Sequence, residues 1–356
     1  MRLAIILVHF HTPELAAEAV DALREDLGGS GIETEWLLVD NGSDEEGRAR
    51  LESLGLRRID PGANLGYAGG VNLGVACSTA ETVIAMNPDV FVLPGCVPAL
   101  LDRLRSGAAV AGPAFFWDRG RRMLLPPAEP RGRRDELLTL LAGRSERWAT
   151  CARRHWRSHA RRHWEARAPL ESHSLSGSLL AIRRDAWKRV GPFDEGFRLY
   201  FEETDWLLRA RRLGLRSEYV PAAEAIHLHG QSANRETRAR QWFEDSARRF
   251  RRLHYGAWFT SLLESLDKRV PDRPRPGLPR VPEEGLDLAL KADYPLWVEV
   301  SPNRSGFPAA AERIDEPVPA WKLSEEIARR ISGTPWLVQV SDRRGREILR
   351  REWRVA

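Results

Sequence analysis

Short apolar runs and amphipathic stretches alternate along the first sixty residues. Residues 3–8 and 36–39 are short and apolar, a pattern typical of buried strands, and we also predict a short strand at 56–59. Residues 13–27 have helical spacing of apolar positions, start at Pro13 and precede a glycine pair, which predicts a helix. Strands that alternate with helices predict an α/β fold with a doubly wound, mostly parallel sheet.

A fourth apolar run, residues 82–90 with the sequence TVIAMNPDV, stops abruptly at Asn87-Pro88-Asp89. We interpret it as a buried central strand. In open α/β sheets ligands bind at the carboxyl ends of the strands, so Asp89 is placed to hold a metal ion or a phosphate. The alternative is a plain turn, because asparagine, proline and aspartate all favour turns.

A glycine-rich segment follows the third predicted strand. Residues 64–72, NLGYAGGVN, lie at a strand-to-helix turn, where glycines let the backbone approach a ligand and a helix N-terminus favours negative charge. The turn after the first strand is His9-Phe10-His11-Thr12 and lacks the G-x-G-x-x-G fingerprint. We therefore set aside an NAD-dependent dehydrogenase.

The rest of the chain predicts more of the sheet and then a separate small domain. An amphipathic helical stretch covers residues 235–270, and five prolines in PDRPRPGLPRVP indicate a stiff linker at 271–283. We predict a large α/β domain over residues 1–270 and a small β-rich accessory domain over 284–356. Further strands are expected at 176–182, 215–220, 296–300, 336–340 and 347–353.

The composition is that of a soluble globular protein, with 42% hydrophobic and 29% charged residues. No run approaches the roughly 18 apolar residues that span a bilayer, and residues 3–8 are too short for a signal-peptide core. We expect the chain to stay in the cytoplasm. Cys77, Cys96 and Cys151 fit no disulfide or metal-binding spacing, so we interpret all three as packing residues.

The net charge of +5 is modest, but arginine and histidine crowd residues 119–167. In a predicted basic helical insertion near residues 131–167, tryptophans recur every eight residues and histidines every four: Trp148, Trp156, Trp164, His155, His159 and His163. Three interpretations compete: a histidine metal site, a solvated basic helix, and a helix on an anionic membrane surface or lipid diphosphate acceptor. The metal site is the least favoured, because no carboxylate or cysteine completes it.

The segments VHFHTPEL, LLVDNGSDEE, NLGYAGGVNLGV and MNPDV resemble, in order and approximate spacing, the signatures of the family 2 glycosyltransferases. Residues 176–232 resemble the second half of that family, so the likeness covers about residues 2–232. It is closest to the bacterial branch that includes rhamnosyltransferases of cell-envelope polysaccharide assembly. The resemblance implies a GT-A fold and a metal-dependent, inverting transfer of a sugar from a nucleoside-diphosphate sugar to a glycan or lipid-linked acceptor.

The resemblance also implies site residues. Asp40 would contact the nucleotide base, and Asp89 with His227 would bind the Mn²⁺ or Mg²⁺ that bridges the sugar diphosphate. Asn87 stands where the family usually carries an aspartate, so fewer charges hold the metal. The donor- and nucleotide-binding set is His9, Thr12, Asp40, Asn41, Asn64, Gly66, Ala68, Asn72 and Asn87.

Three acids gather in the first turn of a helix expected to begin near Glu202. Their interaction with the helix dipole would alone explain them. The functional interpretation is a general base, the carboxylate that removes the proton of the acceptor hydroxyl during inverting transfer. By resemblance the base is Glu203, where the family usually has aspartate, with Glu202 and Asp205 as fallbacks. Clustered carboxylates would raise one another's proton affinity.

Two rival functions stay open at this stage. A non-catalytic sugar- or nucleotide-binding module is the first, because Asn87 and Glu203 both depart from the commonest family pattern. A structural adaptor at a membrane surface is the second, and it rests on the basic tryptophan-bearing helices. No nucleic-acid partner is expected. The family branch favours deoxythymidine-diphosphate rhamnose as donor. If the acceptor is lipid-linked, we expect a peripheral contact of the protein with the inner face of the cell membrane.

Overall fold

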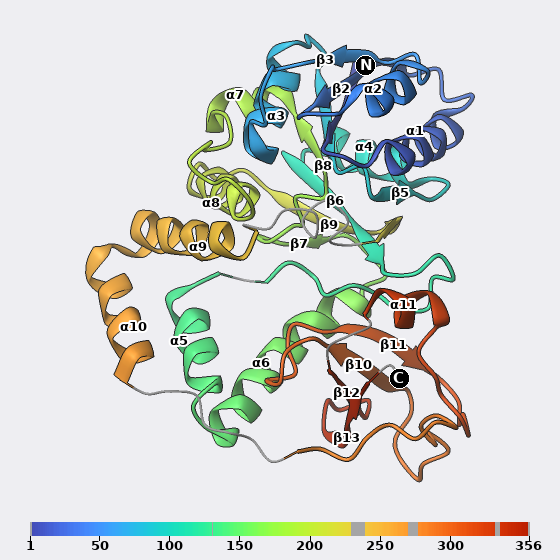
Figure 1. Cartoon of the computed structure of the whole chain (residues 1–356), viewed down its shortest axis with the longest axis vertical. Coiled ribbons are helices and arrows are strands. Elements are labelled where there is room, and N and C mark those ends of the chain that lie inside the picture. Colours follow the sequence, from blue (N-terminus) through green and yellow to red (C-terminus); the bar gives the residue numbers. More distant parts are fainter. Residues whose placement is uncertain (1, 130, 229–238, 270–276, 332–334, 355–356) are drawn as a thin grey trace. The chain divides into compact units, whose positions relative to one another are not determined.

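The computed structural model describes residues 2–129, 131–228, 239–269, 277–331 and 335–354, and these divide into two compact units (Figure 1). Unit 1 comprises Met1–Phe115 and Ala166–Thr260, and unit 2 comprises Phe116–Glu165 and Ser261–Ala356. His229 and the first part of the predicted linker, residues 271–276, lie outside the described residues.

Unit 1 is a sheet covered by helices (Figure 1). Its elements in chain order are β1 (Arg2–His9), α1 (Pro13–Leu27), β2 (Glu33–Asp40), α2 (Glu45–Glu52), β3 (Arg57–Ile59), α3 (Gly66–Ala76), β4 (Thr82–Met86), β5 (Val90–Val92), α4 (Cys96–Arg105), β6 (Val110–Phe116), β7 (Leu170–Glu171), β8 (Leu179–Arg183), α7 (Arg184–Val190), α8 (Glu202–Arg212), β9 (Ser217–His227) and α9 (Ala239–Tyr255).

The strand order is β3-β2-β1-β4-β8-β6-β9-β5, with β7 also paired to β9. The first four strands run parallel, whereas the pairs β4–β8, β6–β8, β5–β9 and β7–β9 are antiparallel. Every residue of β4 is buried, as its uninterrupted apolar run predicts. The α/β fold class is therefore confirmed, and the strands at 90–92 and 110–116 are additions that the sequence did not predict.

The glycines of α3 serve helix packing as well as the turn. A Cβ on Gly70 would lie 2.6 Å from a methyl of Val8, and one on Gly74 would lie 2.4 Å from a methyl of Ile6. Only glycine therefore allows α3 to rest this closely on β1. At Gly70, which lies in the segment 64–72, the sequence-based expectation of ligand approach is wrong, because the free side of this glycine meets β1.

Unit 2 contains an antiparallel sheet with the strand order β11-β10-β12-β13. Its strands are β10 (Leu296–Ser301), β11 (Ala310–Ile314), β12 (Trp336–Ser341) and β13 (Glu347–Trp353), and its helices include α5 (Arg133–Ala142), α6 (Glu146–Trp164) and α11 (Glu325–Arg330). One face of the sheet packs Val298 and Val340 with Trp117 and Ile327 in an apolar core. The α10 helix (Ala257–Arg269) begins in unit 1.

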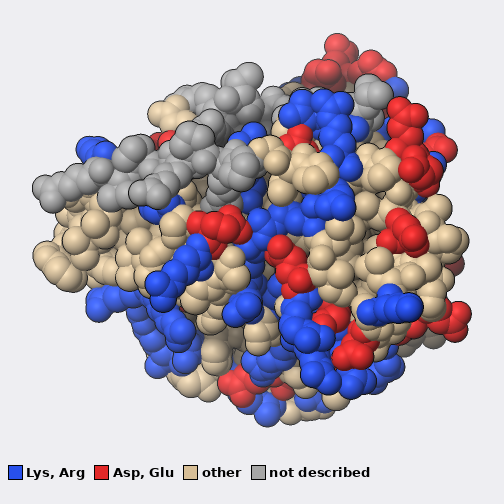
Figure 2. All heavy atoms as spheres, turned by 90° about the horizontal axis from the view of Figure 1, so that it is seen from below, with Lys and Arg blue, Asp and Glu red and all other residues tan. Residues whose placement is uncertain are grey.

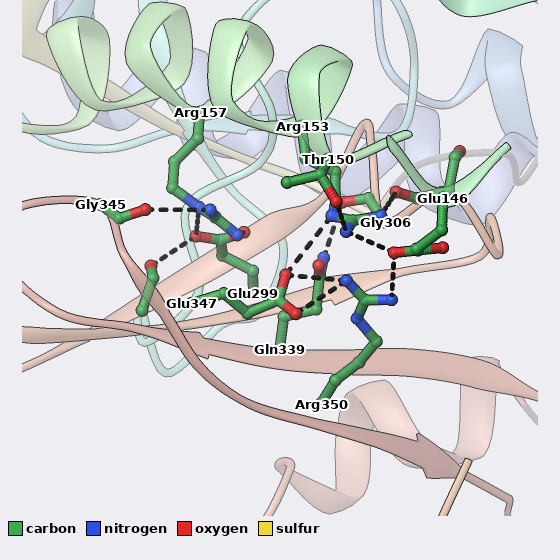
Figure 3. A network of polar contacts seen from close by, with 12 residues as sticks. Glu146, Thr150, Arg153, Arg157, Glu299, Gly306, Gln339, Gly345, Glu347 and Arg350 are labelled. Atoms are coloured by element: carbon green, nitrogen blue, oxygen red, sulfur yellow. Dashed lines mark hydrogen bonds and ion pairs between the residues drawn. The ribbon is translucent and has the colours of Figure 1, made fainter. Parts of the chain in front are cut away.

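The opposite face of this sheet is polar yet buried, because α6 covers it. Arg157 donates to both carboxylate oxygens of Glu299, at 2.5 and 2.9 Å, and both side chains are almost fully buried (Figure 3). Arg161 donates to Ser341 Oγ and to the Asp342 carbonyl. The sequence placed residues 131–167 in the large domain as a solvated or membrane-facing helix, whereas their buried arginines pair with the C-terminal strands.

The histidines of α6 have separate partners. His155 Nε2 lies 3.0 Å from an oxygen of Asp135, and His159 Nε2 donates to the Ala128 carbonyl at 3.0 Å. Burial, aided by the neighbouring His163, lowers the pKa of His159 to about 4. Among the described residues no group of three histidine, cysteine, aspartate or glutamate side chains could hold a metal ion. The histidine metal-site hypothesis is therefore wrong for this part of the chain.

The predicted amphipathic stretch 235–270 is two helices, α9 and α10, separated at Gly256, whose φ is +87°. Phe250 is fully buried, whereas Leu253 and Trp258 are 51% and 76% exposed. Basic side chains gather in clusters on the face shown in Figure 2, with acidic ones between them. None of the described helices is both long and apolar enough to cross a bilayer. Cys151 is exposed, so its interpretation as a packing residue is wrong.

Candidate active site

The two predicted metal ligands meet where β4 ends. The pairing of β5 with β9 sets Val90 opposite His227, and the Leu228 N–H donates to the Asp89 carbonyl. As a result His227 Nε2 lies 3.6 Å from Asp89 Oδ1, with both side chains buried. Burial lowers the pKa of His227 to about 4, so its imidazole is neutral near pH 7 and can act as a metal ligand.

Carboxylates from two elements surround Tyr67, which lies in the first turn of α3. Burial raises the pKa of Tyr67 well above its usual value, and the charges of Glu202, Glu203 and Asp89 raise it further. The Tyr67 hydroxyl donates to the Gly177 carbonyl at 2.5 Å. A Cβ on Gly177 would lie 3.1–3.3 Å from carbons of Glu203, so the Glu203 side chain rests on this glycine.

Glu202 and Glu203 differ in their surroundings. Burial, with the neighbouring charge of Glu203, raises the pKa of Glu202 well above its usual value. Glu202 Oε2 is buried without a hydrogen-bond partner. Glu203 accepts a hydrogen bond from Thr204 Oγ1 at 3.2 Å. A carboxyl group that stays protonated cannot remove a proton from a substrate, so this contrast favours Glu203 over Glu202 as a base.

Asp205 is engaged on both carboxylate oxygens. Arg209 Nε donates to Oδ2 at 2.8 Å, and His254 Nε2 lies 2.8 Å from Oδ1. Burial would raise the pKa of Asp205, but these hydrogen bonds and the charge of Arg209 outweigh it and lower the pKa. Because His254 belongs to α9, Asp205 fastens α9 to α8.

The backbone is strained immediately before α8. Tyr200 and Phe201 both have positive φ, at +65° and +72°, a conformation that costs non-glycine residues of order 1–3 kcal/mol each. Phe201 is buried against Phe243 and Phe250, which offsets this cost. Helix α8 starts at Glu202 as predicted, and the strained pair sets the direction of its first turn.

On the predicted nucleotide-binding side of the site, Asp40 accepts several hydrogen bonds. Its Oδ1 accepts from the Ser43 N–H at 2.9 Å and Ser43 Oγ at 2.7 Å, and its Oδ2 accepts from Arg58 at 3.1 Å. Although burial acts in the opposite direction, the two hydrogen bonds from Ser43 lower the pKa of Asp40. His9 Nε2 accepts from the Thr12 N–H at 2.8 Å, and the buried Thr12 Oγ1 has no partner. Arg58 carried no sequence signal, because a single arginine in a short strand is unremarkable.

Three predicted donor-site amides hold the backbone. Asn41 donates to the Gly66 carbonyl, and Asn64 Oδ1 accepts from the Gly66 N–H. Asn72 accepts from the Phe193 N–H at 2.9 Å and donates to Glu195 at 2.8 Å. The main chain of a fourth asparagine, Asn87, donates to the Ser178 carbonyl.

The remaining predicted donor positions lie at the start of α3. Gly66 has φ +71°, and a Cβ there would lie 2.9 Å from the Arg198 carbonyl oxygen. Ala68, two residues further on, is buried. Together these positions anchor the turn between β3 and α3 against the loop that precedes α8.

Comparison with known proteins identifies the family. The chain is 34% identical over 223 residues to the N-acetylglucosaminyl-diphospho-decaprenol L-rhamnosyltransferase of Mycobacterium tuberculosis, which covers 56% of this chain and 68% of that protein. It is 25% identical over 256 residues to a low-salt glycan biosynthesis hexosyltransferase of Haloferax volcanii, covering 70% and 74%. A solved mannosyltransferase from Pyrobaculum calidifontis, in complex with GDP-Man and Mn²⁺, matches with a TM-score of 0.44 and 14% identity over 77% and 76% of the two chains.

A match to a family model shows to which family the chain belongs. Residues 4–190, slightly more than half of the 356, match the model described as glycosyl transferase family 2. The matched region holds the whole parallel half of the sheet, Asp40 and Asp89. The chain therefore belongs to glycosyl transferase family 2, a family of sugar-transferring enzymes.

Proposed function

We propose that unit 1 is a metal-dependent, inverting glycosyltransferase. It moves a sugar from a nucleoside-diphosphate sugar to a hydroxyl group of a cell-envelope glycan or a lipid-linked acceptor. The observation that carries the proposal is the placement of Asp89 beside His227, at 3.6 Å, with Glu203 near the same tyrosine as Asp89.

The residues present fit a divalent metal ion. Asp89 offers a carboxylate oxygen and His227 a neutral imidazole nitrogen, both of which Mn²⁺ accepts. Two protein ligands leave room for diphosphate oxygens, the arrangement that Mg²⁺ and Mn²⁺ sites commonly use with phosphate substrates. Bound there, the metal ion would act as a Lewis acid that stabilises the charge of the departing nucleoside diphosphate.

The protein's own groups would carry the rest of the reaction. Glu203 would accept the proton of the acceptor hydroxyl. At the same time the hydroxyl oxygen would attack the anomeric carbon of the donor sugar from the face opposite the leaving group. Asp40, Thr12 and the turn at Gly66 would hold the nucleotide, and the unpartnered Thr12 Oγ1 is available for that contact. The Asn41 and Asn64 bonds to Gly66 would keep this turn rigid, and the Asn72 bond to Phe193 would hold α3 against the loop before α8.

The names of the relatives indicate which donor and which acceptor to propose for the transfer. Because a relative is named for L-rhamnose transfer to N-acetylglucosaminyl-diphospho-decaprenol, we propose deoxythymidine-diphosphate rhamnose as donor and a sugar-bearing lipid diphosphate as acceptor. A lipid-linked acceptor also implies contact with a bilayer, for which the exposed Leu253 and Trp258 are suited beside Arg252. Loss of anionic-liposome binding in Trp258→Ser would support that contact, and unchanged binding would exclude it.

A transfer assay tests the proposed function. The full chain is incubated with Mn²⁺, a panel of nucleoside-diphosphate sugars and a short-chain lipid diphosphate bearing N-acetylglucosamine. We expect one donor to give a disaccharide product whose new linkage has the inverted anomeric configuration by NMR. A product with retained configuration would contradict the inverting mechanism. Donor binding without any product would favour the non-catalytic binding module.

A further inference from the structure

A pocket of about 320 Å³ lies in unit 1, lined by the loop before α8 and the start of α9. Its described lining is Gly196 and Arg198, from the loop before α8, and Trp242, Asp245 and Ser246, from the first two turns of α9. This volume is within the range of about 300–1,000 Å³ typical of small-molecule sites. The family signatures in the sequence do not include the α9 residues, so nothing yet assigns this pocket a ligand.

The α9 wall of the pocket is firmly attached. Arg249 pairs with Asp194 at 2.7 Å, and its guanidinium lies so close to Gly196 that a Cβ there would be 2.5 Å from the Arg249 Cζ. The Arg249 guanidinium also sits 5.5 Å from the ring centre of Phe197. With the Asp205–His254 bond further along the helix, these contacts preform the pocket rather than leaving it to close on a ligand.

The loop that lines one wall of the pocket is connected to both parts of the proposed active site. Arg198 precedes Glu202 by four residues, and its carbonyl oxygen rests against Gly66 of the donor turn. On the α9 side, Tyr200 packs edge-on to Phe243, with ring centres 5.6 Å apart. The loop that carries Arg198 therefore links the pocket to the donor turn at Gly66 and to the start of α8, the helix that bears Glu203.

The lining chemistry suits a sugar joined to a phosphate. The Arg198 side chain is exposed and makes no hydrogen bond or ion pair within the described chain. A guanidinium binds phosphate oxygens through two parallel hydrogen bonds. The half-buried Trp242 lines the pocket, and an indole ring packs well against the apolar side of a sugar ring. Asp245, which lies 3.7 Å from Arg248, has a carboxylate that can accept hydrogen bonds from sugar hydroxyl groups.

We propose that this pocket is the acceptor subsite and that Arg198 binds the diphosphate of a lipid-linked acceptor, while Trp242 packs against the acceptor sugar. The inference rests on the proposed glycosyltransferase function. Arg198 and Trp242 are then specificity-determining residues for the acceptor. The competing source of the same chemistry is the donor's own diphosphate, because the Arg198 main chain touches the donor turn.

Arg198→Gln separates these sources by steady-state kinetics with two acceptors. One acceptor is N-acetylglucosamine on a short-chain lipid diphosphate, and the other is the same sugar on a neutral aromatic group. We expect the KM of the diphosphate acceptor to rise about 10–100-fold, as loss of a charge-assisted hydrogen bond predicts. The KM values of the neutral acceptor and of the donor should stay within twofold. Trp242→Ala should raise the KM of both acceptors.

Controls keep the outcomes distinct. Arg189→Gln removes an exposed arginine of α7 in unit 1 that does not line the pocket, and it should leave both acceptor KM values unchanged. A rise in the donor KM of Arg198→Gln would assign the residue to the donor instead, and no change in any KM would overturn the proposal. If the chain transfers no sugar, calorimetric binding of the diphosphate acceptor, lost in Arg198→Gln, tests the pocket separately from the proposed function.

Discussion

Replacing Glu203 by glutamine should lower kcat about 10²–10⁴-fold, the contribution typical of a positioned general base. The glutamine keeps the size of the side chain that rests on Gly177 but cannot accept a proton. Donor binding should persist, because Glu203 lies on the acceptor side of the proposed reaction. Turnover with a saturating donor, and calorimetric donor binding by the same variant, measure the two quantities.

Glu202→Gln is the matched control for this prediction. Burial beside Glu203 raises the pKa of Glu202 and so favours its neutral form, which a neutral amide closely imitates. We therefore expect a loss of at most about tenfold in kcat. If Glu202→Gln lost as much as Glu203→Gln, the base would be misassigned; equal activity in Glu203→Gln and the unchanged chain would remove Glu203 from the mechanism.

Arg157→Ala should destabilise unit 2 by about 3–5 kcal/mol, because it leaves the fully buried carboxylate of Glu299 without its partner. Ser341 Oγ donates to the same carboxylate at 2.8 Å and cannot neutralise its charge. Hydrogen exchange in the full chain measures this loss of stability at individual backbone amides. Amides of β10 and β12 should lose protection, whereas those of β1 in unit 1 should not.

Two further variants separate the buried charge from general damage to α6. Arg154→Ala changes an exposed arginine of the same helix and should alter stability by no more than about 0.5 kcal/mol. Arg157→Met combined with Glu299→Met removes both charges at similar volume, so it should be more stable than either single variant. Equal loss of protection in Arg154→Ala and Arg157→Ala would contradict the role of the ion pair.

Local patterns were sufficient for the elements whose burial follows from their own residues. Helix α1 has the predicted bounds, and β1 extends the predicted strand by one residue at each end, because a proline start and an uninterrupted apolar run are local signals. The short strands β5 and β6 were missed because they pair antiparallel with partners far along the chain. A segment of three to seven apolar residues contains no local sequence signal for pairing with a distant strand.

The buried polar face of unit 2 shows what local patterns cannot give. The sequences LWVEVS of β10 and WLVQVS of β12 alternate as strands with one face in water do. Glu299 is nevertheless fully buried, because Arg157 of α6 pairs with it, and Gln339 is fully buried with its side-chain amide donating to the Gly306 carbonyl. A helix that carries Arg153, Arg157 and Arg161 at four-residue spacing has the pattern of a solvated basic face. These arginines are buried only because the helix packs against a sheet that carries their partners.

The site residues were predicted from the order of sequence motifs, because the sequence contains no direct information on distances between them. Asp89 could be placed at a sheet edge from its strand, but its approach to His227 depends on a pairing between residues more than a hundred positions apart. Amide side chains were the least predictable. Asn72 is equally suited to a nucleotide and to the backbone of Phe193, and hydrogen-bond chemistry alone does not choose between them.

The most direct test of the central claim is a calorimetric titration of the full chain with a panel of nucleoside diphosphates, with and without Mn²⁺, repeated on Asp89→Ala. The account predicts that one nucleotide binds tightly, that binding requires Mn²⁺, and that Asp89→Ala abolishes this metal-dependent binding. Absence of metal-dependent binding for every nucleotide, or equal binding by Asp89→Ala, would contradict the metal-assisted transfer proposed for this site.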